Sequence, residues 1–443
     1  MIGKQEETAE TEVSIYVEDY VTPTGSQRAV NEVIGETITL KREFKNTVQF
    51  TYSNDVLVVG DPFVIVVPNV RGQYTGKFNV GARVKLYLKN PNVAGGALTL
   101  KHTGIIVDRS ASSVKGAGSI IQLQCADIGW HLQENDAPLW YNLRSGDLVK
   151  LLQDPKFILP SWRFAGVQLE SVTAKNTRLN NGLRDVRIQL NAQAIQPLQY
   201  IQVEPGDKVI DLIFQYARRL NLLVNVGPDG HIILWNPDYN QKPLYRLDYH
   251  QADDIDSVRN NVESAKVHES AQSIYTKVVV VGERVQFEFD DPNNPNAAKF
   301  RGAFTPKTAP LPFDHNLFTA DPEMFTLGLA AKGAEWKWKR GIFDSWSATY
   351  TVRGHYQGGM WWESDTMCEV HDSVHGHDGL FYVSSVTYIR DGQGDRTEVT
   401  IRKPNLLSAA FGVYPNAPTI KYSTKSESGT ADTPTKSTQT SPS

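Results

Sequence analysis

The segment from Trp346 to Pro404 constrains the fold most, because apolar and polar residues alternate along it. The alternation divides it into four runs: WSATYTVRG, TMCEVHD, GLFYVSSVTYI and RTEVTIR. A period of two places one set of side chains on a core face and the other in water or against a partner. A glycine-containing loop at 391–395 is typical of a hairpin. The segment therefore predicts four β-strands, and it contains no catalytic motif.

The first strand-rich region along the chain begins at Glu36, and the segment above belongs to the second. The first region contains seven runs: ETITLKREF, TVQFTYS, DVLVVG, FVIVVP, RVKLYLK, KHTGIIVDR and SIIQLQCAD. Their spacing of about 8–15 residues, with Gly, Pro and Asn between them, is typical of a barrel or a sandwich. Two weaker runs, VQLESVTA and RDVRIQLNA, follow after residues 128–165, which break the pattern.

Residues 203–236 change to a helical pattern followed by a hairpin pattern. Apolar residues recur at helical spacing from Val209 to Leu220, and Asp207 can cap the start of such a helix. The runs NLLVNV and HIILW then read as two strands around a turn at 227–230. We expect a compact helix–hairpin module whose apolar stripe is a buried helix face.

These patterns predict a mainly β protein with a small α+β module. The predicted segments are an N-terminal arm (1–35), a first β-barrel domain (36–200) with an insert at 128–165, a helix–hairpin α+β module (201–256), a second β-barrel domain (257–415) with a long irregular insert at 287–332, and a Ser/Thr-rich C-terminal tail (416–443). The arm contains one possible strand at 13–17. Because arm and tail are too polar to bury themselves, we expect both to gain order only on a neighbouring chain.

Charge and hydropathy argue against several classes of protein. The 443 residues carry a formal net charge of -4, which disfavours a strongly basic nucleic-acid-binding surface. No apolar run approaches the ~18–20 residues that span a bilayer, and the N-terminus does not resemble a signal peptide. Cys125 and Cys368 could pair, but two thiols in so long a chain favour free cysteines in a reducing compartment. We expect synthesis and folding in the cytoplasm of the producing cell.

Four residues in the order C-x2-H-x3-H-x-H form a candidate metal site: Cys368, His371, His375 and His377. Zinc could use three of these donors. On an alternating strand, however, Cys368 faces away from His371, and the run HDSVHGHDG is typical of a solvated turn. We therefore assign no metal and no cofactor, and keep these four residues as weak candidates.

Two aromatic stretches offer other chemistry. Glu363 and Asp365 lie near Trp361 and Trp362, as in a sugar-cleaving site, but glycosidases need two carboxylates at a defined separation. The run EWKWKR at 335–340 could stack single-stranded nucleic acid. Tryptophans in a β-domain are more often core or interface anchors. Because no phosphate-binding loop, nucleophile elbow or metalloprotease motif is present, we assign no catalytic residue and favour a structural assembly protein over an enzyme.

The order of modules resembles a known family. The helix module begins G-D-x-V-x-D-L at Gly206, its hairpin reads D-G-x-I-x-x-W from Asp229, and a strand Y-T-K-V-V-V-V-G-E follows. The last region contains S-D-T-M-C-E-V-H-D, L-F-Y-V-S-S-V-T-Y-I-R-D and T-E-V-T-I-R-K-P-N, ending near Pro404. Over residues 36–415 the chain resembles the central baseplate hub protein of contractile-tailed bacteriophages, the Mu-like tail protein P family related to late-control protein D.

This resemblance implies a homotrimeric ring. Each subunit would carry two tail-tube-like β-barrels, so that the ring joins the sixfold tail tube to the threefold central spike and lines the DNA channel. The implied partners are two further copies of the chain, tail tube or tube-initiator proteins, the spike protein and other baseplate proteins. Genomic DNA would be passing cargo, no membrane would be bound, and the location would be the tail baseplate of the virion. The alternative from another class is a tail-associated peptidoglycan or polysaccharide hydrolase, or a glycan-binding β-module.

Overall fold

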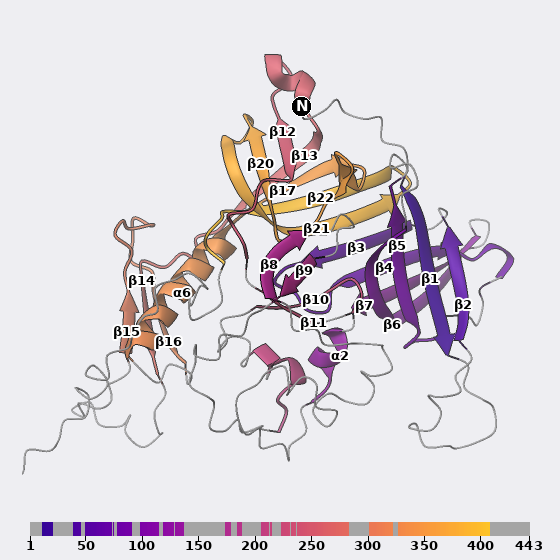
Figure 1. Cartoon of the computed structure of the whole chain (residues 1–443), viewed down its shortest axis with the longest axis horizontal. Helices are drawn as coiled ribbons and strands as arrows, with labels where there is room; N and C mark the ends of the chain where they lie inside the picture. The colour runs from indigo at the N-terminus through magenta and orange to yellow at the C-terminus, as the bar shows by residue number, and fades with distance from the viewer. Residues whose placement is uncertain are drawn as a thin grey trace, which may run out of the picture. The chain divides into compact units, whose positions relative to one another are not determined.

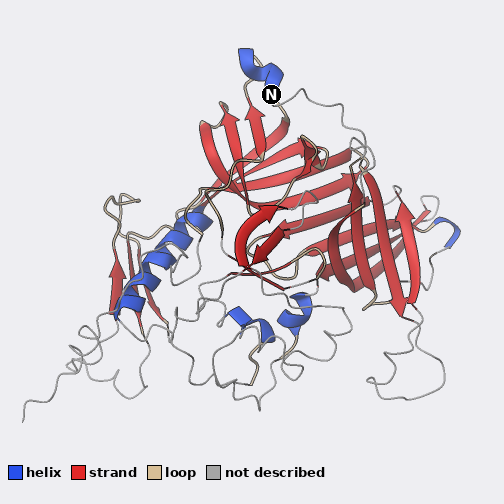
Figure 2. Cartoon of the chain, viewed as in Figure 1, coloured by secondary structure: helices blue, strands red, loops and turns tan. Residues whose placement is uncertain are grey.

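The chain forms two compact units. The first contains the described residues within Met1–Glu269 and Trp346–Asn405, and the second those within Ser270–Ser345 and Leu406–Ser443. Strands dominate the described residues taken together, which confirms the mainly β prediction (Figure 2). No helix in the described residues is long and apolar enough to cross a membrane. The computed structural model describes residues 11–20, 39–45, 49–72, 74, 78–90, 98–114, 118–127, 129–136, 173–178, 184–187, 205–211, 213–214, 223–230, 232–235, 237–282, 301–321 and 327–407.

Within those residues, thirteen strands of the first unit form one sheet (Figure 1). Across it they follow the order β13 (Val262–Glu269), β17 (Trp346–Arg353), β22 (Gly394–Arg402), β21 (His377–Asp391), β3 (Gln49–Asp55), β4 (Pro62–Pro68), β7 (Gly118–Asp127), β6 (Thr99–Val114), β5 (Arg83–Lys89), β1 (Glu12–Tyr20) and β2 (Thr39–Lys45). From the first part of β21 the sheet branches to β20 (Thr366–Asp372), which pairs in parallel with β12 (Tyr245–Tyr249). The other pairs in this sheet are antiparallel.

The four strands predicted between Trp346 and Pro404 are β17, β20, β21 and β22, and burial alternates along β17 as the sequence predicts. The hairpin between β21 and β22 is tighter than the expected loop at 391–395. Asp391 pairs with Gly394, so only two residues form the turn. Gly394 has a φ of +103°, a conformation that suits glycine.

The N-terminal segment differs from the predicted arm, because residues 12–20 form β1 between β2 and β5. Val13, Ile15 and Val17 are buried in the core. The possible strand at 13–17 is confirmed and extended, and the expectation that arm 1–35 gains order only on a neighbour is wrong for this part. Three alternating aliphatic residues suffice to bury one strand face, although the segment is polar on average. Residues 1–10 and 21–35 of the arm, and the tail 416–443, lie outside the described residues.

The two strand-rich regions join where β3 pairs with the second part of β21. On the core face, the rings of Tyr52 and Tyr388 stack with centroids 6.0 Å apart. On the other face, the hydroxyls of Ser53 and Thr387 are 3.1 Å apart. One hydrophobic core contains buried residues from both regions. The strands that were assigned to two barrel domains, 36–200 and 257–415, thus share one continuous sheet.

A buried ion pair anchors the start of β1 to the last hairpin. The Arg390 guanidinium donates to the Asp395 carboxylate at 2.6 and 2.7 Å, and also to the Thr11 carbonyl. The Thr11 N–H donates to Asp395 at 2.9 Å. Burial alone would raise the pKa of Asp395, but hydrogen bonds from Arg390 and His355 outweigh it and hold that pKa well below its usual range. The N-terminal strand is therefore tied to residues more than 370 positions away.

A pair of buried carboxyls, Asp61 and Asp127, fixes the start of β4 to the end of β7. Asp127 accepts three backbone N–H groups, from Gly60 at 3.2 Å, Asp61 at 2.9 Å and Gly129 at 2.6 Å. Asp61 accepts the Asp55 N–H at 3.2 Å. Burial, and then the charge of Asp127, raise the pKa of Asp61 well above its usual value. Because Asp127 has more donors, we assign the negative charge to Asp127 and the proton to Asp61.

The predicted helix–hairpin module is described in part. Residues 209–211 and 213–214 are helical, and the two predicted strands are β10 (Leu223–Val226) and β11 (Ile232–Trp235). A short helix, α2 (Gly129–Glu134), lies in the predicted insert 128–165, whose residues 137–165 are outside the described residues. The second weaker run contributes β9 (Arg184–Arg187), which pairs with β8 (Thr173–Arg178). β8 overlaps the first weaker run only at residues 173–174, and residues 167–172 of that run lie outside the described residues.

The second unit packs α6 (Leu327–Ser345) against β14 (Lys277–Val281), β15 (Arg301–Phe304) and β16 (Asn316–Ala320). β14 is central, antiparallel to β15 and parallel to β16. The expectation of an irregular insert at 287–332 is therefore wrong for its described residues, 301–321 and 327–332. The strands RGAF and NLFTA are too short for their alternation to be recognised in the sequence. Residues 287–300 and 322–326 lie outside the described residues.

Candidate functional site

A surface knob follows β12. We define the knob as residues 250–261, which contain the 3-10 helix η2 (Ile255–Arg259) and lead into β13. The Asp254 carboxylate caps η2 by accepting the Asp256 N–H at 3.1 Å. This cap satisfies an N–H group that would otherwise lack an acceptor at the helix start.

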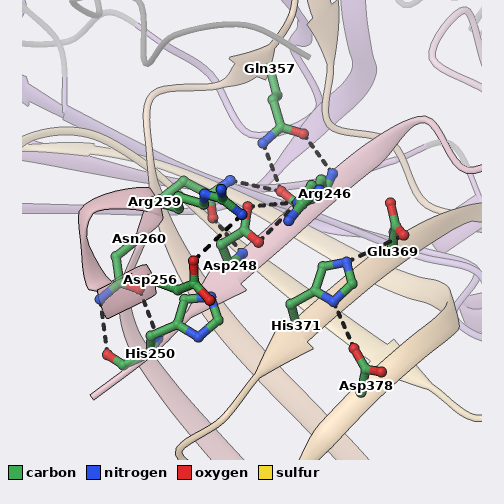
Figure 3. Close-up of polar contacts among 11 residues, drawn as sticks. Arg246, Asp248, His250, Asp256, Arg259, Asn260, Gln357, Glu369, His371 and Asp378 are labelled. Carbon is green, nitrogen blue, oxygen red and sulfur yellow. Dashed lines mark hydrogen bonds and ion pairs between the residues drawn. The ribbon is translucent and has the colours of Figure 1, made fainter. Parts of the chain in front are cut away.

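Two asparagine side chains fix the knob: Asn260 joins its two ends, and Asn261 binds it to the backbone of β12. The Asn260 amide accepts the His250 N–H at 2.7 Å and donates to the His250 carbonyl at 3.0 Å (Figure 3). The Asn261 amide accepts the Asp248 N–H at 3.0 Å and donates to the Arg246 carbonyl at 2.7 Å. Each amide thus makes the paired bonds that a neighbouring strand would make. The side chains hold the knob in one shape.

The side chain of Gln357 holds β12, the strand that precedes the knob, in the same way. The Gln357 amide accepts the Arg246 N–H and donates to the Arg246 carbonyl, both at 2.8 Å (Figure 3). Gln357 lies on β18 (Tyr356–Gln357), which pairs with β19 (Met360–Trp361). The Arg246 Nε donates to the Asp248 carboxylate, 2.9 Å from each oxygen. The backbone of β12 therefore has side-chain partners from two other segments.

The hairpin of β20 and β21 lies beside β12 and carries the histidines. His371 Nδ1 lies 2.7 Å from the Asp378 carboxylate, and its Nε2 lies 3.3 Å from Glu369 (Figure 3). His375 Nδ1 lies 2.8 Å from the buried Asp372, which also accepts the Tyr350 hydroxyl at 2.8 Å.

These contacts stabilise the turn of the hairpin. Burial, and then the hydrogen bond to Asp372, raise the pKa of Tyr350. Asp372 also accepts the backbone N–H groups of Val374 and His375, both at 2.9 Å. The carboxylate therefore organises the turn, as the solvated-turn interpretation of the sequence expects.

The four weak metal candidates are not brought together. Cys368 is fully buried in the core, on the face of β20 opposite to His371. Burial raises the pKa of the Cys368 thiol, whereas a metal ligand must be a thiolate. The rings of His375 and His377 stack with centroids 6.3 Å apart, and His377 also contacts Trp346. In the part of the chain that is described, no group of three or more His, Cys, Asp or Glu residues could hold a metal ion.

The other candidate residues are structural contacts. Trp361 and Trp362 are buried in the core, as the sequence favours. Glu363 pairs with the buried Lys101, at 3.3 Å, and the carboxylate of Asp365 accepts the Tyr382 hydroxyl at 2.9 Å.

The aromatic–basic run 335–340 is part of α6. Trp336 and Trp338 pack against the core of the second unit, and Trp338 donates to the Tyr275 carbonyl at 2.9 Å. The rings are therefore used inside the fold instead of forming an open stacking surface. Cys125 and Cys368 are both buried and free, as the cysteine count predicts.

The knob itself was missed by the sequence analysis. Ile255 and Val258 are 91% and 88% exposed, more than any other described large hydrophobic residue. They are three positions apart in a 3-10 helix, where such residues lie on the same side. The available signal was an isoleucine and a valine in an otherwise polar turn, DDIDSVRNN. An aliphatic pair exposed on a fixed support is a candidate interaction surface.

The sequence matches no protein-family model and no curated protein. Solved structures with a similar fold include two tail proteins. One is the tail protein from Neisseria meningitidis MC58, at a TM-score of 0.60 and 17% identity over 90% of this chain and 98% of that chain. The other is the 43 kDa tail protein of prophage MuSo2 from Shewanella oneidensis, at a TM-score of 0.62 and 16% identity over 88% of this chain and 99% of that chain.

The chain shares its fold with these tail proteins. The likeness covers nearly the full length of both proteins, so it concerns the whole chain and not one module. At this identity it establishes the fold, whereas a function has to be argued from the residues.

Proposed function

We propose that the chain is a structural protein of a phage tail, and specifically the baseplate hub of a contractile tail. In this proposal three copies form a ring that joins the sixfold tail tube to the threefold central spike and surrounds the DNA channel. Tube or tube-initiator proteins, the spike and other baseplate proteins are its partners, and DNA is passing cargo. The protein acts in the tail baseplate of the virion, and no residue has a catalytic role.

The full-length similarity to two tail proteins carries the proposal. The edges of the sheet add support. The Asn261 N–H donates to the Asp248 carbonyl at 3.2 Å, and the Asn261 side chain bridges β12 and the start of β13. The Asn260 side chain adds a contact to His250, the residue after β12. Strands β12, β20, β21, β22, β17 and β13 therefore come close to closing on themselves. This arrangement favours a barrel in the second strand-rich region, since closure protects strand edges.

The contacts do not favour the hydrolase or the glycan-binding alternative. A sugar-binding platform needs accessible aromatic rings, but Trp361 and Trp362 are 8% and 1% exposed. The Lys101 ammonium lies 5.0 Å from the centre of the Trp361 ring and neutralises the nearby Glu363. The two tryptophan rings and the Glu363 carboxylate therefore make contacts within the fold and are not open to a sugar.

Light scattering of the purified full chain tests the proposal. We expect a mass of about 148 kDa, three times the chain mass of 49.4 kDa, at high protein concentration. Electron microscopy should show a threefold ring with a central hole. A chain that stays monomeric at high concentration and lacks a threefold feature inside tail particles would contradict the hub. Peptidoglycan turnover by the pure chain, abolished by Glu363→Gln, would instead support the hydrolase.

A further inference from the structure

We propose that the knob docks on a second copy of this chain, at a patch formed by η1 and the end of the β6–β7 hairpin. The proposal rests on the proposed homotrimer and names the surfaces that would join its subunits. The knob supplies Ile255 and Val258, and the patch supplies a complementary apolar and basic surface.

The knob presents two aliphatic side chains on a support that is already fixed in shape. Its two aliphatic side chains project from a short helix that is capped by Asp254, held within the knob by Asn260 and fixed to β12 by Asn261. A support of this kind loses little conformational freedom when a partner binds. Single exposed aliphatic residues are ordinary, but two on one side of a fixed helix form a continuous apolar tip.

The surroundings of the tip are acidic. Asp256 is partly compensated by Arg259, at 3.5 Å, and Asp254 is used as the helix cap. Asp253 is exposed, and within the described residues no hydrogen bond or ion pair engages its side chain. A partner surface should therefore offer aliphatic side chains together with at least one cation, since complementary charges guide association and disfavour wrong partners.

The same chain offers such a surface at a different place. We define the η1 patch as Val70, Arg71, Val114 and Ile120, with η1 spanning Val70–Gly72. The three aliphatic residues are 60%, 63% and 44% exposed, and Arg71 is exposed as well. Within the described residues, no hydrogen bond or ion pair engages the Arg71 side chain.

The strand register gathers this patch at one end of the hairpin. Pro68 and Ser112 pair with Ile120 from its two sides, and Val114 pairs with Gly118. Positions 118 and 120 lie on one face of β7, so Val114 and Ile120 are diagonal neighbours. η1 joins them because the Asn69 N–H, next to Val70, donates to the Ser119 carbonyl at 2.8 Å.

A contact between two different surfaces of identical chains is head-to-tail, and it can close into a ring when the rotation between copies permits. The acidic residues around Ile255 and Val258 and the arginine of the η1 patch fit this arrangement. A contact between two knobs would instead oppose like charges. The knob and the patch would then repeat at each junction of the ring.

Sedimentation of the full-length chain over a concentration series tests the contact. The double variant Ile255→Ser, Val258→Ser should raise the self-dissociation constant about 10- to 100-fold, because two aliphatic anchors are lost. Val80→Ser is the matched control, since Val80 is 63% exposed but belongs to neither surface. The control should associate like the wild type, and all variants should keep the wild-type unfolding midpoint because the changed side chains are exposed.

A charge exchange tests whether the partner is this patch. Asp253→Arg and Arg71→Asp should each weaken association several-fold, and the two together should restore it. Arg71 has a φ of 52°, which aspartate also tolerates. As a second measurement, Val258→Cys with Val114→Cys should give disulfide-linked trimers, because both natural cysteines are buried.

Two results would overturn the proposal while leaving the homotrimer intact: unchanged association of the knob variant, or a double charge variant no better than the single ones. Absence of the cross-link in a trimeric protein would have the same meaning. A wild type that is monomeric at every concentration would overturn both this contact and the proposed homotrimer.

Discussion

Replacing each member of the buried Asp61–Asp127 pair by asparagine should have very different effects on stability. Asparagine resembles a protonated carboxyl in shape and in its lack of charge. If Asp61 carries the proton, Asp61→Asn keeps the natural charge state and should change the free energy of unfolding by less than about 1 kcal/mol. Asp127→Asn removes the charge that accepts three backbone N–H groups.

The cost of Asp127→Asn follows from these three bonds. One of the two carboxylate oxygens becomes an NH2 group, which must face the Gly129 N–H or the N–H groups of Gly60 and Asp61. A hydrogen bond to a charged group contributes about 1.5–3 kcal/mol, and a buried N–H without an acceptor adds about 1–3 kcal/mol. We expect a loss of about 3–5 kcal/mol.

The pair also predicts a pH dependence with a definite sign. Because the pKa of Asp61 is raised in the folded state, the folded chain binds more protons than the unfolded chain at mildly acidic pH. This contribution to stability is complete below the unfolded pKa of about 3.9 and is lost as the pH rises through the folded pKa. Asp61→Asn should weaken this dependence without abolishing it, because burial also raises the pKa of Asp127, to about 6.

Urea unfolding followed by tryptophan fluorescence at several pH values measures both effects. The wild type and Asp61→Asn should have similar midpoints at mildly acidic pH. Asp127→Asn should unfold at a lower urea concentration, most clearly at neutral pH, where Asp127 is charged. If Asp61→Asn is the more damaging change, the proton lies on Asp127 and the assignment is reversed.

Three further substitutions test other contacts. Gly302→Ala should loosen the second unit by about 1–3 kcal/mol, seen as faster proteolysis of that unit alone, because its Cβ would lie 2.0 Å from the Ala330 backbone. Asp395→Asn should lower the free energy of unfolding by about 3–5 kcal/mol in urea, since Arg390 would remain buried without its carboxylate. Asn261→Ala should speed protease cleavage in the knob, because two bonds to β12 are lost; an unchanged rate would show that the knob does not depend on them.

Alternation made much of the sheet predictable. β20 coincides with the predicted run TMCEVHD, and the runs in the first region locate β3, β4, β5 and β7 to within a few residues. Each strand has one buried face, so the period of two is present in the sequence. The run DVLVVG is an exception: it forms a turn, although Val56 and Val59 are buried. A short apolar run without alternation cannot distinguish a strand from a turn that contributes to the core.

Contacts between distant segments were not predictable. No sequence pattern near Thr11 indicates that its carbonyl accepts a hydrogen bond from Arg390. No pattern near Asn260 and Asn261 indicates that their side chains bond to backbone groups as a neighbouring strand would. The separation of Cys368 from His371 was predictable, by contrast, because alternation along a strand places the two side chains on opposite faces of β20. The candidate knob was missed because exposure, and not composition, distinguishes Ile255 and Val258.

The sheet of the first unit is complete only when the N-terminal strand β1 and the C-terminal hairpin of β21 and β22 have both joined it. β1 occupies an interior position, between β2 and β5, although it begins at residue 12. Its first contact, at Thr11, is with the hairpin that contains Arg390 and Asp395, the last to be synthesised in this unit. Pairing across such a separation carries a large loop-closure cost, which the core must offset. A subunit arranged in this way presents its complete outer surface only after the C-terminal hairpin has joined the sheet, which suits a protein whose proposed role is assembly with copies of itself.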